Sequence, residues 1–231
     1  MAVSLDELAT RVRPVALAGE ARLPVAAPLE PLLAGGLRRG STVTVHGSTS
    51  LALGLLARAT VEGSWAAVVG VPSLGLAAAE ELGVDLARLA LVPHPGGQWA
   101  IVAAALVDAF DLVVVAPPGR AKPADARRLM AKTRERGAVL VPVGAWPEPA
   151  DVRLGVASAE WQGLGDGHGR LRARRVEVVA QGRGAAARER RVQLWLPGPD
   201  GTMSTAGDAP AAAVQDPVIA ESPRRSIAVA G

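Results

Sequence analysis

A turn rich in glycine and hydroxyl side chains separates a short apolar segment, with Val43 and Val45, from a long apolar run that starts at Leu51. A strand, a glycine-containing turn and a helix in this order form a phosphate-binding loop, where backbone N–H groups hold an anion at the helix N-terminus. We therefore predict the frame of a nucleotide site here. Its candidate anion ligands are Gly47, Ser48, Thr49 and Ser50, but for the three hydroxyl side chains we favour capping of the following helix over anion binding.

The side chains that such a loop needs for chemistry are missing. The motif G-x-x-x-x-G-K-[ST] supplies a lysine for the β- and γ-phosphates and a hydroxyl for Mg²⁺. When the motif is aligned with its first glycine at Gly47, Ala52 stands at the position of the second glycine, Leu53 at that of the lysine and Gly54 at that of the hydroxyl residue. We therefore predict a degenerate phosphate loop that binds no cofactor, and a chain that is not an enzyme.

Other kinds of site have little support in the sequence. The chain has no cysteine, which excludes disulfides and thiolate metal sites. His46, His94 and His168 lack the spacing of metal ligands, so no metal is expected. Residues 100–118 form the longest apolar run, but Asp108 and Asp111 interrupt it, which argues against a membrane span. An acidic rather than basic start argues against a signal peptide, and we expect a cytoplasmic protein.

The elements around the turn alternate between strand and helix. The expected strands are residues 43–45, 65–70, 89–92, 112–115 and 138–143, and the expected helices end near residues 63, 82, 110 and 136. This alternation predicts an α/β fold, a mostly parallel sheet with helices on both faces. Residues 153–157, 174–180 and 191–196 then alternate in strand fashion, the last two as a hairpin, which predicts a C-terminal antiparallel extension.

Three regions follow from these patterns. Residues 1–30 form an N-terminal helix, expected over about 5–13 behind the capping box Ser4 to Glu7, and a proline-rich arm. Residues 31–197 form the core. Residues 198–231 have no hydrophobic period and are expected to be a disordered tail. Small apolar residues in that tail could order on a partner: Val214, Val218, Ile219, Ile227 and Val229.

Several segments in order resemble the core of RecA. Leu33 to Gly40, followed by an apolar strand and His46-Gly47, resembles the entry to its phosphate loop, and residues 82–89 and 126–130 resemble two later segments. The likeness spans about residues 23–197 and implies a RecA-like, P-loop NTPase-type fold. Two acidic residues of that family are replaced: Ala116 stands where an acid would hold Mg²⁺, and Val71-Pro72 where an acid would orient water. ATP hydrolysis is therefore not expected.

A RecA-like chain without these motifs resembles ImuA-prime, the RecA- and SulA-related mutasome accessory proteins of actinobacteria. The resemblance implies a non-catalytic scaffold in the SOS response to DNA damage that supports error-prone translesion synthesis. Its expected partners are ImuB and also RecA or a second copy of the chain, at the nucleoid when recruited to damaged DNA. Two alternatives stay open: a SulA-like cell-division inhibitor that binds FtsZ, and a RecA-like protein with residual nucleotide binding.

A dense group of arginines lies in the predicted late strands. The net charge is only +3, and a GC-rich coding bias would also raise the arginine content. The density still makes weak, non-specific contact with DNA, or contact with an acidic partner, a hypothesis. The residues are Arg170, Arg172, Arg174, Arg175, Arg183, Arg188, Arg190 and Arg191.

Overall fold

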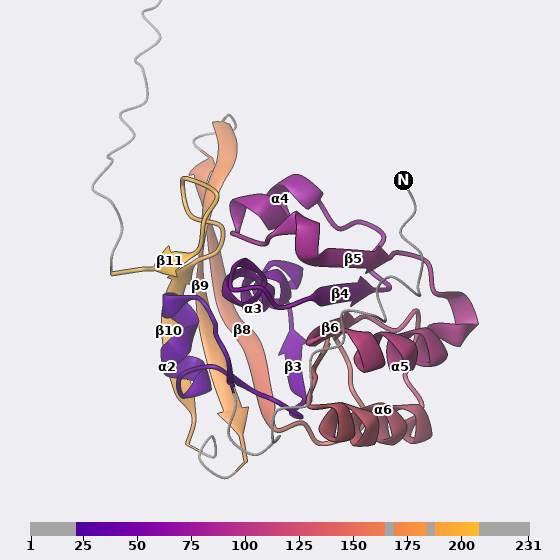
Figure 1. The fold of residues 1–231 in the computed structure, drawn as a ribbon. Helices are drawn as coiled ribbons and strands as arrows, with labels where there is room; N and C mark the ends of the chain where they lie inside the picture. The colour runs from indigo at the N-terminus through magenta and orange to yellow at the C-terminus, as the bar shows by residue number, and fades with distance from the viewer. Residues whose placement is uncertain (1–21, 165–168, 184–187, 208–231) are drawn as a thin grey trace, which may run out of the picture.

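The computed structural model describes residues 22–164, 169–183 and 188–207 (Figure 1). The predicted helix over residues 5–13, His168 and the five apolar tail residues from Val214 to Val229 lie outside the described residues. No helix in the described ranges is long and apolar enough to cross a membrane.

Four parallel strands form one sheet of the described chain, in the order β5-β4-β6-β7. They are β4 (Ala66–Val69), β5 (Leu89–Val92), β6 (Leu112–Val115) and β7 (Val139–Pro142). All residues of β4, β6 and β7 are buried, because helices cover both faces. This two-sided burial explains why these strands are continuous apolar runs in the sequence.

The strand that leads into the phosphate loop continues this sheet. β3 (Val43–His46) lies beside β7, joined by the bridges Thr42–Leu140 and Val45–Val143. On its other side β3 pairs in parallel with β8, and antiparallel strands follow in the order β9, β10, β11. Their bounds are β8 (Val152–Leu164), β9 (Gly169–Gly182), β10 (Arg190–Trp195) and β11 (Ser204–Thr205). The predicted parallel sheet with an antiparallel extension is thus confirmed.

Helices cover the two faces of the parallel strands. Val68 and Val114 pack into the cluster that contains α3 (Thr49–Val61) and α4 (Leu76–Glu81). The alternate residues Val69 and Val115 pack into a second cluster with α5 (Trp99–Ala109) and α6 (Pro123–Arg136). Pro123 in the first turn of α6 and Gly137 at φ +66° after its end are ordinary start and stop residues. The α/β layering therefore follows the predicted alternation.

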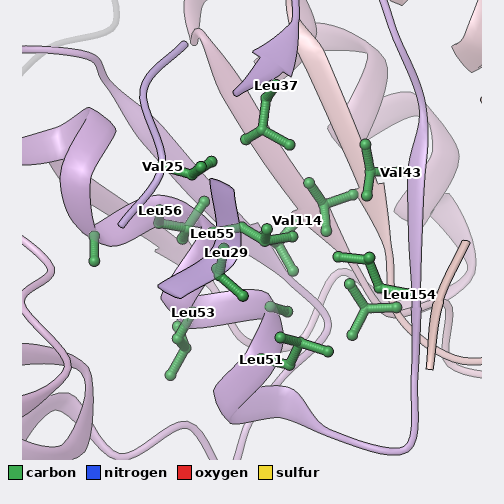
Figure 2. Packing of buried hydrophobic residues seen from close by; sticks show 14 of the residues in the cluster. Val25, Leu29, Leu37, Val43, Leu51, Leu53, Leu55, Leu56, Val114 and Leu154 are labelled. Carbon is green, nitrogen blue, oxygen red and sulfur yellow. The ribbon is translucent and has the colours of Figure 1, made fainter. Parts of the chain in front are cut away.

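Helix α3 is the centre of the larger cluster. Figure 2 shows Leu51, Leu55 and Leu56 among side chains from the strands and from the N-terminal segment. The segment that covers α3 contains the 3₁₀-helix η1 (Ala27–Leu29) and α2 (Glu30–Leu33). Short 3₁₀-helices η2 (Leu86–Arg88) and η3 (Gly96–Gln98) precede β5 and α5. Because α3 is covered on the sheet side and on this outer side, it is apolar nearly all round.

Both predicted region boundaries differ from the structure. Part of the expected arm belongs to the core, where Leu23, Val25 and Leu29 are buried, and β1 (Arg22–Leu23) pairs with β2 (Leu37–Arg38). Residues 198–207, expected to be disordered, fold back so that β11 pairs with β10 and Met203 packs on Gly54 of α3. Such short segments show no hydrophobic period, because only one or two side chains in each contact the core.

Strands β8 and β9 are longer than the sequence predicted. The outer parts, residues 160–164 and 169–175, pair with each other, and we call them the ribbon. β3 leaves β8 at Gly155 and β10 pairs with β9 from Arg175, so the ribbon extends past the neighbouring strands (Figure 1). Gly163, at φ +104°, lies at an irregularity in the pairing.

Candidate functional site

The phosphate loop is reduced to a helix cap. β3 ends at His46 and α3 begins at Thr49, so only Gly47 and Ser48 lie between them. Gly47 has φ +80°, which lets the chain turn sharply. The backbone N–H of Leu51 donates to Oγ of Ser48 at 3.1 Å. Ser48 thus acts as the N-cap of α3, the second of the two roles considered for this turn.

The motif positions lie inside the helix rather than in the loop. Ala52, Leu53 and Gly54 belong to the first two turns of α3 and are buried. Leu53, at the lysine position, is 4% exposed and packs in the larger core cluster. A side chain at this position therefore faces the core, away from any anion at the helix N-terminus.

One of the two acid positions, Ala116, is closed by backbone contact with the end of β4, whereas Pro72 at the other is exposed. Gly70 follows β4 with φ +79°, and its Cα packs against the carbonyl of Ala116, which follows β6. The Ala116 N–H donates to the Val69 carbonyl at 2.9 Å, and the Gly70 N–H donates to the Val92 carbonyl at 2.9 Å. The ends of the strands thus meet without side chains between them at Gly70 and Ala116.

Titratable groups do not gather at this loop. Among the described residues no group of three or more His, Asp or Glu side chains could hold a metal ion. Hydrogen bonds from Gln181 and Arg191 hold the pKa of the Glu189 carboxyl below its usual range, and the Thr202 hydroxyl does the same for the pKa of Asp200. Both carboxyls are exposed side chains in the antiparallel part of the molecule, away from the loop.

The eight arginines do not form one patch. Four of them lie within residues 170–175 of β9, and the other four lie toward its C-terminal end and the start of β10. The nearest members of the two groups are Arg175 and Arg191, which is opposite Val179, and they are separated by about 13 Å along the strand at 3.3 Å per residue. The group on the ribbon contains Arg170, Arg172, Arg174 and Arg175. The group at the β9–β10 turn contains Arg183, Arg188, Arg190 and Arg191.

The two arginine groups differ in their charge partners. At the turn, Arg191 pairs with Glu177 at 3.4 Å and with Glu189 at 2.6 Å. On the ribbon, the Arg174 guanidinium lies 5.7 Å from the ring centre of Trp161, a side chain that is 46% exposed. The other ribbon arginines are exposed and have no ion pair within the described residues: Arg170, Arg172 and Arg175. The ribbon, whose four arginines face one acid, Glu160 opposite Arg175, therefore presents net positive charge beside an exposed aromatic ring.

About half of the chain is similar to known proteins. Residues 31–148 match the family model described as the MT3502 N-terminal domain. A stretch of 126 residues is 39% identical to the uncharacterized protein Rv3395c of Mycobacterium tuberculosis. This alignment covers 54% of the chain and 55% of that protein, so the chain spans about half the length of the relative it matches. The family match includes the phosphate loop and ends before the ribbon.

Proposed function

The chain belongs to the MT3502 N-terminal domain family, and we propose that it is a non-catalytic, RecA-like accessory protein of the mutasome. In this role it supports error-prone translesion synthesis by binding ImuB, and RecA or a second copy of the chain. The observation that carries the proposal is the phosphate loop. The strand, turn and helix remain, while the lysine position is the buried Leu53 and an acid position is Ala116.

Further support comes from the sheet. The strand before the phosphate loop, β3, lies in its interior between β7 and β8, with helices on both faces of the parallel strands. The antiparallel extension predicted from the alternation of the late residues follows β8. A chain that keeps this frame without the side chains for phosphate and Mg²⁺ retains its binding surfaces, and so we assign it a scaffolding role.

Affinity capture from DNA-damaged cells tests the proposal. The full chain is expected to recover ImuB, and a chain truncated after Gly207 is expected to recover much less while melting at the same temperature. The described fold ends at Gly207, so this truncation spares β11 and Met203, whereas a truncation at Pro197 would not. Recovery of FtsZ without ImuB would contradict the proposal and favour a division inhibitor. Full recovery of ImuB by the truncated chain would place the interface on the core.

The ribbon is expected to give weak, sequence-independent binding to duplex DNA. Each phosphate neutralised contributes about 0.9 to the slope of log K against log salt concentration. Replacing Arg170, Arg172 and Arg175 together with alanine should therefore lower the slope by up to about 2.7. Arg191→Ala is the matched control, because that guanidinium is already paired with Glu177 and Glu189. Equal slopes for the triple variant and the wild type would remove DNA from the partners of the ribbon.

A further inference from the structure

A hollow lies on the sheet face opposite α3, beside the end of β3. Val45 and Leu154 point into the core around α3, so by the alternation of strand residues His46, Arg153 and Gly155 point to the other face. The cross-strand pairs on this face are His46–Gly155, Gly155–Val179 and Arg153–Gln181. Gly155 thus occupies the centre of a small grid of side chains and contributes none itself.

The missing side chain leaves an open space. The hollow has a volume of about 370 Å³ and is lined by His46, Arg153, Ala157, Val179 and Gln181 around Gly155. A Cβ atom built on Gly155 meets no heavy atom within 4 Å. A glycine inside a strand commonly marks a place where another molecule comes close to the backbone. Here Gly155 lies between the imidazole of His46 and the apolar side chains of Ala157 and Val179.

The charges around the hollow favour an anion. Among the described residues, no carboxylate lines it. Three acids on neighbouring residues already accept hydrogen bonds: Asp151 from Arg38 and the Thr42 N–H, Glu189 from Gln181 and Arg191, and Glu177, two residues from Val179, from Arg191. Arg153, by contrast, is exposed and has no hydrogen bond or ion pair within the described residues. The guanidinium of Arg153 and the imidazole of His46 can therefore both donate to one oxyanion.

We propose that this hollow binds a phosphate group. Arg153 and His46 donate hydrogen bonds to its oxygens, and the group lies over the bare backbone of Gly155. A guanidinium forms two parallel N–H···O bonds with a phosphate, which gives such a site both affinity and orientation. The phosphate can belong to a free phosphate compound or to a nucleic-acid backbone. The site is distinct from the degenerate loop, because it lies on the opposite face of the sheet from α3. It does not depend on the proposed mutasome role.

Titration of the ¹⁵N-labelled full chain with inorganic phosphate, and separately with single-stranded oligothymidylate, tests the site. We expect the amide signals of His46 and Gly155 to shift. Arg153→Ala should weaken binding about ten- to a hundredfold. Gly155→Val should abolish it, since the valine side chain covers the bare backbone that the phosphate would contact, yet suits a strand and meets no atom at its Cβ. Both variants should melt like the wild type.

The two probes distinguish the sources of the phosphate. Much tighter binding of the oligonucleotide, with the same dependence on Arg153, would identify a nucleic-acid strand, and similar affinities would identify a free phosphate compound. Arg127→Ala, on α6, where the guanidinium is already paired with Glu148, is the control and should leave binding of inorganic phosphate unchanged. The absence of shifts at His46 and Gly155 with both probes at millimolar concentration, or wild-type affinity in both hollow variants, would overturn the proposal.

Discussion

Replacing Gly70 with alanine is expected to lower the free energy of unfolding by about 3–4 kcal/mol and the melting temperature by about 10 °C. Gly70 has φ +79°, where a side chain costs about 1–2 kcal/mol. The added Cβ would also lie far inside van der Waals contact with the Ala116 carbonyl, well below the 3.0 Å that real Cβ atoms keep. Relief would require β4 and β6 to separate, and overpacking of this kind costs about 1–3 kcal/mol more.

Gly119→Ala provides the matched control for this effect. Gly119 lies in the exposed loop after β6, its φ is not positive, and no atom lies within 4 Å of a Cβ built there. The Gly119→Ala substitution should change the free energy of unfolding by less than about 0.5 kcal/mol, as for most surface positions. Thermal or urea unfolding of both variants gives the comparison. Equal stabilities would mean that the ends of β4 and β6 are not in backbone contact, and that room for an acidic side chain remains between them.

The parallel part of the fold was predictable because its signals are local. The strands 89–92 and 112–115 have the predicted bounds, since both are short apolar runs between clear turn or helix signals. The ribbon was missed because Glu160, Gln162, Arg170 and Arg172 interrupt any apolar pattern, and because most of its residues pair only with one another. The remaining signal was the glycine-rich composition of residues 165–169, between two stretches of alternating polarity.

The candidate site was predictable only in part. Counting residues from Gly47 showed that the motif was broken, and that Ser48 could be a cap. The burial of Leu53 depends on where α3 begins and on the layer that covers it, which includes residues far away in the sequence. The hollow around Gly155 depends on the register of three strands from distant segments. Register depends on which face of each strand is buried and on the turns that join the strands, so the facing of residues from separate segments cannot be read from any one of them.

Restoring the motif lysine by Leu53→Lys is expected to prevent folding rather than to restore nucleotide binding. Leu53 is 4% exposed in the larger core cluster. Truncating such a leucine costs about 2–5 kcal/mol by itself. A buried ammonium without a partner adds a desolvation penalty, even if it loses its proton. Together these costs approach the whole stability of a typical domain, about 5–15 kcal/mol. Circular dichroism during thermal unfolding should show no cooperative transition, or one far below that of the wild type.

Two controls separate the position of the lysine from its chemistry. Val61→Lys introduces the same side chain on the same helix, at a residue that is 62% exposed, and should be nearly neutral. Leu53→Met keeps volume and polarity and should cost less than about 1.5 kcal/mol. A folded Leu53→Lys variant whose melting temperature rises with Mg-ATP would show that residue 53 reaches the phosphate site. Loss of folding in that variant alone would mean that the site cannot be regained by one substitution, because the loop has been shortened and the helix that follows it has become part of the core.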